Sequence, residues 1–121
     1  MKWLREMYTG EKLAGDLPSI LHRIDEENGE MTDLCRLITL STAQQCQLDI
    51  LPVKEITKPF YRQADLAVVG IAADRKEAQT VVTRMLEDCM KAGKGGQLRT
   101  YFEAMGEDAF GSREEVSVRQ S

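Results

Sequence analysis

The stretch from Asp65 to Gly93 constrains the fold of this chain more than any other. It begins with an apolar run from Leu66 to Ala72 and continues through Asp74-Arg75-Lys76-Glu77 into a long amphipathic pattern. An apolar run without polar alternation is typical of a strand that is covered on both faces, as in sheets layered with helices. The stretch therefore predicts a buried strand followed by a helix.

The helix of this unit has recognisable ends and one apolar face. Asp74 is placed to cap its amino terminus, and Glu77, three residues on, can return a hydrogen bond to the amide of the cap. Gly93 can adopt the left-handed conformation that ends many helices. The residues predicted to face the sheet are Ala78, Val81, Val82, Met85, Leu86, Cys89 and Ala92. Their 3.6-residue spacing predicts one long helix packed on the sheet.

The beginning of the chain is expected to be helical. Residues 1–8 carry apolar side chains at the spacing of one or two helical turns, and so do residues between Glu11 and Glu27, where Asn28-Gly29 is typical of a helix end. Pro18 conflicts with one continuous helix, because an internal proline removes a hydrogen bond and clashes with the preceding turn. The helix therefore either kinks at Pro18 or begins at Asp16 as its cap.

Two short strands are predicted next, over residues 34–40 and 46–51. The few polar residues between them favour an antiparallel hairpin. Leu48 and Ile50 alternate with polar residues, which indicates a strand with one face toward water, near an edge of the sheet. Pro52 ends this strand, since it cannot donate to a ladder. Residues 53–58 fit a short helix.

The end of the chain is less regular. Residues 97–102 fit a last strand or a short helix about equally, and both alternatives stay open. Residues 103–121 are polar and aperiodic, with too little apolar content to offset the entropy of ordering them. We therefore expect a single compact domain over 1–102 and a mobile tail over 103–121. The fold class is α/β (α+β), with a small mixed sheet of three to four strands and two main helices.

Composition narrows the classes of function. The formal net charge of -4 over 121 residues gives no general attraction to nucleic acid or to anionic lipid. The longest apolar run falls far short of the roughly 20 residues that span a bilayer, and the amino terminus lacks the apolar segment of a signal peptide. Three cysteines without Cys-x-x-Cys spacing argue against disulfides and zinc. We expect a cytoplasmic protein with free thiols, no cofactor, and neither nucleic-acid nor membrane partners.

Two glycine-containing turns are candidates for anion binding. Ala92-Gly93-Lys94-Gly95-Gly96 contains glycines and a lysine, but it follows a helix instead of opening one, which favours a helix stop. The turn from Gly70 to Asp74 is the better candidate, because the following helix directs unpaired amides beyond the end of the strand. Its candidate ligand-binding residues are Gly70, Ala73 and Asp74. The carboxylate of Asp74 can itself occupy those amides, and a plain connecting turn is the favoured interpretation.

Other reactive side chains favour structural interpretations. His22 is the only histidine, and a solvated surface position is favoured over metal binding. Cys46 could act as a nucleophile only with a lowered pKa, whereas Cys35 and Cys89 fit small core residues. A basic and aromatic group could stack nucleic-acid bases, but a solvated face above core aromatics is favoured. This group comprises Lys54, Lys58, Phe60, Tyr61 and Arg62.

Three stretches can be taken together: residues 2–8 (KWLREMY), residues 48–52 (LDILP), and residues 65–72 (DLAVVGIA) leading to Glu77-Ala78. They resemble a family of small uncharacterised bacterial α/β proteins of unknown function. The resemblance covers about residues 1–102. It implies a fold and carries no activity or catalytic residues.

Two functional hypotheses follow. The first is a non-enzymatic cytosolic module that self-associates, as a homodimer for example, or binds a partner protein, because an edge strand is expected and no catalytic set is evident. The alternative is a binding protein or enzyme for a small phosphate-type or nucleotide-type molecule, using the strand end and helix amino terminus at Gly70 to Asp74.

Overall fold

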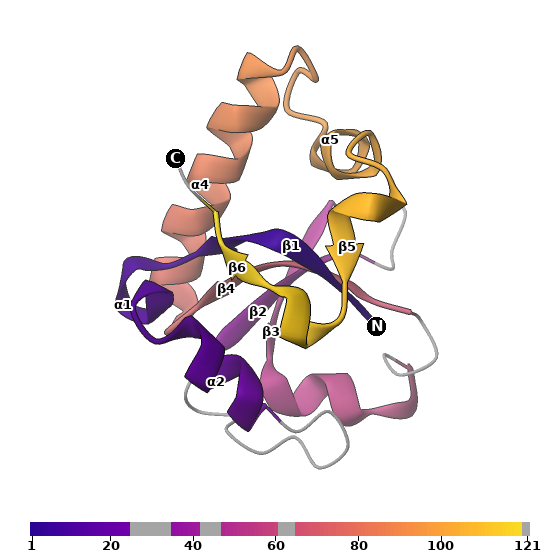
Figure 1. Cartoon of the computed structure of the whole chain (residues 1–121). Helices are drawn as coiled ribbons and strands as arrows, with labels where there is room; N and C mark the ends of the chain where they lie inside the picture. The colour runs from indigo at the N-terminus through magenta and orange to yellow at the C-terminus, as the bar shows by residue number, and fades with distance from the viewer. Residues whose placement is uncertain (25–34, 42–46, 61–64, 120–121) are drawn as a thin grey trace.

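The computed structural model describes residues 1–24, 35–41, 47–60 and 65–119. It contains helices arranged around a mixed sheet (Figure 1). The strands are β1 (Lys2–Thr9), β2 (Arg36–Leu40), β3 (Leu48–Pro52), β4 (Ala67–Ala72), β5 (Phe110–Gly111) and β6 (Ser117–Val118). The helices are α1 (Glu11–Ala14), α2 (Leu17–Arg23), α4 (Arg75–Lys91) and α5 (Leu98–Glu103). Short 3₁₀ segments are η1 (Val53–Thr57), η2 (Glu107–Ala109) and η3 (Arg113–Glu115).

The α+β character is confirmed, but the expected sheet of three to four strands is wrong because the sheet has six strands. Their order is β3-β2-β4-β1-β5, and β6 also pairs with β1. β1 runs parallel to β4, whereas β2 is antiparallel to both β3 and β4. The additional strands come from the first nine residues and from the segment after residue 103.

The helical turns expected over residues 1–8 are wrong, because this segment is β1. Its pairing with β4 is irregular: β1 advances from Trp3 to Tyr8 while β4 advances only from Val68 to Gly70. Buried residues at each end of β1 therefore flank the exposed Arg5 and Glu6. The two buried apolar pairs, one at each end of this irregular strand, have a spacing that resembles that of a helix.

The hairpin and its edge position are confirmed. β2 and β3 are antiparallel with Leu37 opposite Leu51, and β3 ends the strand order. η1 follows directly, as expected for a short helical segment after Pro52. Cys46 lies outside the described residues.

The central unit is also confirmed. All six residues of β4 are buried, and α4 buries Ala78, Val81, Met85 and Cys89 against the sheet. Ala92, at the end of the expected stripe, is exposed instead. Gly93 has φ +77°, and Lys94 N–H donates to the Cys89 carbonyl at 3.1 Å. This bond closes the helix in the manner expected of a left-handed glycine.

The helical segment after β1 is split into α1 and α2. α2 begins directly after Asp16, and Pro18 lies in its first turn, where its missing N–H costs no helical hydrogen bond. The start at Asp16 is therefore the correct alternative, although the Asp16 side chain makes no capping hydrogen bond. The expected helix end at Asn28-Gly29 lies outside the described residues.

Residues 97–102 resolve to the helical alternative, as α5. Within the segment expected to be a mobile tail, β5 and β6 pair with β1. Only Phe110 is buried among the described residues from 103 to 119. This segment is held by main-chain pairing and polar contacts, which low apolar content does not reveal. We call residues 104–119 the C-terminal strap.

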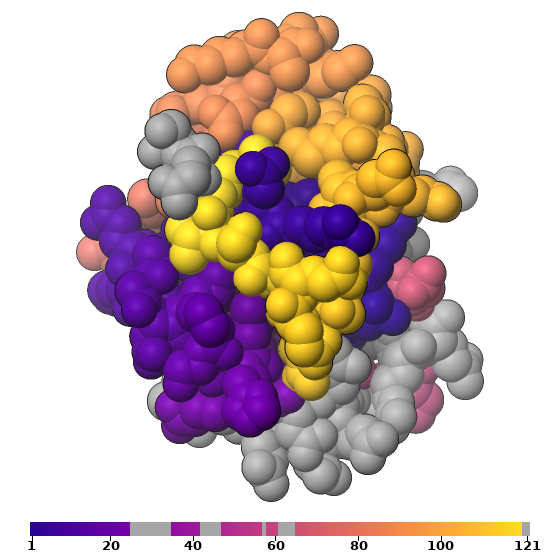
Figure 2. All heavy atoms as spheres, viewed as in Figure 1, coloured from indigo at the N-terminus to yellow at the C-terminus, as the bar shows by residue number. Residues whose placement is uncertain are grey.

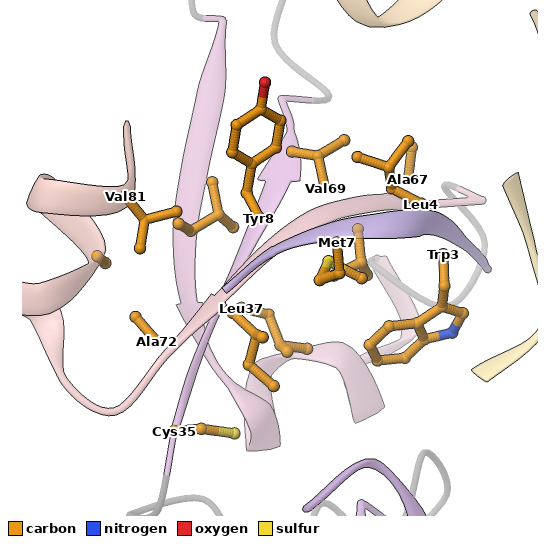
Figure 3. Packing of buried hydrophobic residues seen from close by; sticks show 14 of the residues in the cluster. Trp3, Leu4, Met7, Tyr8, Cys35, Leu37, Ala67, Val69, Ala72 and Val81 are labelled. Atoms are coloured by element: carbon orange, nitrogen blue, oxygen red, sulfur yellow. The ribbon is translucent and has the colours of Figure 1, made fainter. Parts of the chain in front are cut away.

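The sheet lies between two groups of helices. α4 and α5 lie on one side, and α2 and η1 on the other (Figure 1). Tyr8 and Val69 point to one side of the strands, and Trp3, Met7 and Leu37 to the other (Figure 3). Of the described helices, none has the length and apolar character to cross a membrane.

Candidate functional site

Gly70 does not lie in a ligand-accessible turn. It is inside β4, and a Cβ added there would lie 2.6 Å from Met85 Cε and 3.0 Å from Ile38 Cδ1. The glycine therefore permits close packing of α4 and β2 on the strand. Ala73 and Asp74 do lie in the turn after β4, so the structure separates the three sequence-predicted site residues.

The anion position at the start of α4 is filled by two carboxylates of the chain itself. Asp74 Oδ1 accepts from Glu77 N–H at 2.8 Å, which confirms the cap. Glu77 does not return to the Asp74 amide as expected: its Oε1 accepts from Ala73 N–H at 2.8 Å and its Oε2 from Lys12 N–H at 3.1 Å. The amides of Ala73 and Glu77 in this turn are therefore already paired within the chain.

Electrostatic interactions strengthen this corner of the fold, where α1 meets the start of α4. The Glu77 amide, and then the Lys12 ammonium at 3.1 Å, hold the pKa of Asp74 below its usual range. A Cβ on Gly10 would lie 2.0 Å from Glu77 Oε1, so the carboxylate rests directly on the glycine backbone. The corner ties the carboxyl ends of β1 and β4 together, and its chemistry is structural.

The structure brings together a second polar cluster that sequence analysis missed. The Tyr8 hydroxyl donates to Asp88 Oδ2 at 2.6 Å and lies 2.8 Å from the Tyr101 hydroxyl. The Arg119 guanidinium lies over the Tyr8 ring, 4.5 Å from its centroid. Because Tyr8 is 80 positions from Asp88 and 93 positions from Tyr101 in the sequence, no local motif could signal this contact.

This cluster connects β1, α4, α5 and Arg119, which follows β6. Burial, then the hydrogen bond to Asp88, raises the pKa of Tyr8 above its usual range, because an ionised oxygen would be poorly hydrated and would face a carboxylate. Tyr8 thus stays protonated and serves as a donor. The cluster fits a structural connection better than an acid or base in catalysis.

The other candidate residues are not assembled into a reactive centre. His22 is exposed on α2, beside a cavity of about 250 Å³ that also contacts Arg113. Burial raises the pKa of Cys35 to about 11, so this thiol is not an activated nucleophile. Cys89 is also buried, which confirms both as core residues. Within the described ranges, no group of three or more potential ligands could hold a metal ion.

The predicted basic and aromatic group is only partly described. Phe60 is 63% exposed, and Lys54 and Lys58 are exposed as well. Lys58 forms an ion pair with Glu55 at 2.9 Å. Tyr61 and Arg62 lie outside the described residues. The exposure of Phe60 does not fit the core position that the solvated-face interpretation gave it.

A groove of about 530 Å³ lies where the C-terminal strap crosses β1. Leu4 and Met105 contribute apolar surface, while Arg5, Asp108 and Arg119 contribute charges of both signs. Figure 2 shows indigo atoms of the N-terminal segment between the yellow and orange parts of the strap. Arg5 is paired with Glu115 at 2.8 Å, and Arg119 Nε donates to the Glu6 carbonyl. These bonds join the strap to β1.

The outer edge of β3 has a different character. Ser41 N–H donates to the Gln47 carbonyl at 3.0 Å, in register with the β2–β3 ladder. Hydrogen-bonded pairs alternate in an antiparallel ladder, so Asp49 and Leu51 direct their main-chain groups to β2. Leu48 and Ile50 direct theirs outward. Within the described residues, no strand pairs with this outer edge.

Comparisons with protein-family models, curated proteins and solved structures found no match.

Proposed function

We propose that this protein is a cytosolic, non-enzymatic interaction module, whose β3 edge accepts a strand from a protein partner. One observation carries the proposal: β3 ends the sheet with the main-chain groups of Leu48 and Ile50 directed outward. An extended partner segment can satisfy such groups by β-augmentation, in which main-chain hydrogen bonds supply affinity.

The side chains of this edge support the same function. Leu48 and Ile50 are half-buried and pack against the core, so they are ordered and partly available to a neighbouring strand. Cross-strand apolar pairs on one face of a sheet add to the stability of main-chain pairing. The partner segment should therefore be extended and carry apolar residues at alternate positions.

Pro52 limits the length of the interaction. Pro52 has no N–H, and its carbonyl, at the N-cap of η1, accepts the first hydrogen bond of that 3₁₀ helix. A partner can therefore form four main-chain hydrogen bonds, two with Leu48 and two with Ile50. Short paired edges of this kind favour transient binding over permanent assembly.

Two proline substitutions test the proposal in opposite directions. Ile50→Pro removes an outward N–H and leaves the bonds to β2 in place, while Pro52→Ala adds an outward N–H. With a photo-reactive residue at position 49, we expect cross-links to partner protein to be lost in the first variant and strengthened in the second. Met90→Ala, at a residue 67% exposed on α4, is the control and should cross-link like the parent. Equal cross-linking in all variants would contradict the proposal.

A further inference from the structure

We infer that the C-terminal strap opens as one unit while the rest of the sheet stays folded, so that it is a releasable cover on the β1 edge. This edge lies on the side of the sheet opposite β3, and release of the strap is therefore independent of the proposed function. Three properties of residues 104–119 carry the proposal: their packing, the links between their parts, and their connection to α5.

The strap is attached to the fold through little apolar packing. Phe110 is the one buried side chain among residues 104–119, and β5 and β6 contribute two residues each. Three cavities border the strap, of about 530 Å³ beside β1, about 250 Å³ between α2 and η3, and about 210 Å³ beside α5 and Phe110. Such gaps forfeit the close contacts that stabilise a packed interface. The free energy of opening the strap should therefore lie below that of global unfolding.

The parts of the strap are linked to one another, which favours one cooperative opening over separate ones. Glu115 of η3 accepts from the Ser112 N–H and hydroxyl, both at 3.1 Å, and pairs with Arg5 of β1 at 2.8 Å. A Cβ on Gly111 would lie 2.8 Å from Glu115 Oε1 and 3.0 Å from Arg5 Nε, so the ion pair rests directly on β5. β5 and η3 therefore leave β1 together, and β6 begins two residues after η3.

The connection between α5 and the strap suits a hinge. Gly106, which lies between α5 and η2, has φ +85°, and a Cβ added there would meet nothing within 4 Å. The backbone conformation, and not close packing, therefore requires glycine at this position. The wide range of dihedral angles open to glycine lets this residue absorb the rotation that lifts the strap.

Release uncovers main-chain groups at both ends of β1. The Met7 carbonyl accepts from the Arg119 N–H at 2.9 Å. The Lys2 N–H donates to the chain just before β4, so the alternation of a strand turns Trp3 toward β5, where its antiparallel partner is Gly111. The amides of Gly111 and Arg119 therefore report on the two ends of the covered edge.

Native-state hydrogen exchange of the full chain in low urea tests the release. The Gly111 and Arg119 amides should share one free energy of opening. After correction for intrinsic rates, both should exchange at least about tenfold faster than the amides of β2, with a shallow dependence on urea because little surface is exposed. Exchange at the β2 rate, with the β2 dependence on urea, would overturn the inference.

Two substitutions separate release of the strap from global unfolding. Phe110→Ala should speed exchange at Gly111 and Arg119 by on the order of 100-fold, or to the unprotected rate, because it weakens the closed state. Ile56→Val alters a buried residue of η1 and should speed exchange of the β2 amides about two- to tenfold. It should leave both strap amides unchanged, since η1 stays packed when the strap opens. Phe110→Leu, with a smaller effect in the same direction, replaces the alanine variant if that chain does not fold.

Acceleration at Arg119 in Ile56→Val would show that the strap leaves only when the whole fold unfolds, and would overturn the inference. A response to the Phe110 substitution at Gly111 alone would show that β5 and β6 open separately, and would overturn it as well. Cross-linking at position 49 depends on neither result, so the proposed function is tested separately.

Discussion

The two outer edges of the sheet are treated in opposite ways. The β1 edge is covered by the C-terminal strap, whose short strands β5 and β6 pair with it at successive positions. The β3 edge has no such cover within the described ranges and carries only Asp49 and Pro52 to limit pairing. Natural sheets either cover an edge or blunt it against uncontrolled association. In the proposed function, the edge that is only blunted is the one that binds a partner strand.

The cover on β1 is held largely by polar contacts. Arg119 N–H donates to the Met7 carbonyl at 2.9 Å, and the Ser117 hydroxyl donates to the Arg5 carbonyl at 3.3 Å. Lys2 lies over the ring of Phe110, 4.9 Å from its centroid. The β1 edge is therefore held by many small interactions within the chain, whereas the β3 edge has few.

Removing the apolar anchor of the strap should have the largest effect. Phe110 is 8% exposed, and Phe110→Ala should lower the free energy of unfolding by about 3 kcal/mol through lost burial and a residual cavity. Urea unfolding measures the change. Phe60→Ala removes the same side chain at a position 63% exposed and should cost far less. Equal losses in the two variants would show that Phe110 does not anchor the cover.

Substitutions at the corner between the carboxyl ends of β1 and β4 should have the next largest effect on stability. Gly10→Ala displaces the Glu77 carboxylate, and Glu77→Ala removes it, so each should cost about 1–2 kcal/mol through unsatisfied amides. Because both substitutions break the same contacts, the double variant should lose less than the sum of the single losses. Thermal unfolding of the four proteins in this cycle measures the coupling. Strict additivity would contradict a shared role.

A substitution in β2, the strand that pairs with β3, should be stabilising. The Thr39 hydroxyl on β2 is buried, and no hydrogen-bond partner for it is found among the described residues. Thr39→Val should raise the free energy of unfolding by about 1 kcal/mol, since it removes an unsatisfied polar group with little change in shape. Denaturant midpoints at constant slope report this gain. A loss of stability would show that the hydroxyl has a partner in solution.

As the pH falls, the covered β1 edge should lose protection at a slightly higher pH than the open β3 edge. The Ser112 amide, then the Ser112 hydroxyl and Arg5, hold the pKa of Glu115 below its usual value of 4.5. A lowered folded-state pKa means that the carboxylate stabilises at pH above 4.5, and that this contribution is lost as the pH falls through the lower folded value. Hydrogen exchange at the Arg119 amide, corrected for its intrinsic pH dependence, should speed up there. The Leu51 amide should stay protected, and equal loss at both sites would indicate global unfolding instead.

Much of the central architecture was predictable because its signals are local. The apolar run of β4 and the cap at Asp74 depend on neighbouring residues, and the structure confirms both. The edge position of β3 is also confirmed, but its predicted alternation is not, because Leu51 is buried while Leu48, Asp49 and Ile50 are all half-buried. β1 was not predictable, since its irregular pairing with β4 gave an apolar spacing typical of a helix. The strap was missed because main-chain pairing leaves little trace in a polar sequence.

The candidate sites were likewise predictable only where their signals are local. The turn after β4 was predicted at the correct place, but the contact between Glu77 and the Lys12 amide joins residues far apart in the chain. The Tyr8–Asp88 hydrogen bond is equally distant in sequence. Local patterns indicated where helices and strands end, while only the fold showed which polar groups are already satisfied.

Hydrogen exchange at the β3 amides tests the use of the open edge most directly. Asp49 and Leu51 direct their N–H groups to β2 and should be protected at every protein concentration. Leu48 and Ile50 direct theirs outward, so they should exchange fast in the free protein and become protected in the complex with the partner that cross-links at position 49. Fast exchange at Leu48 and Ile50 in that complex would contradict strand pairing through β3.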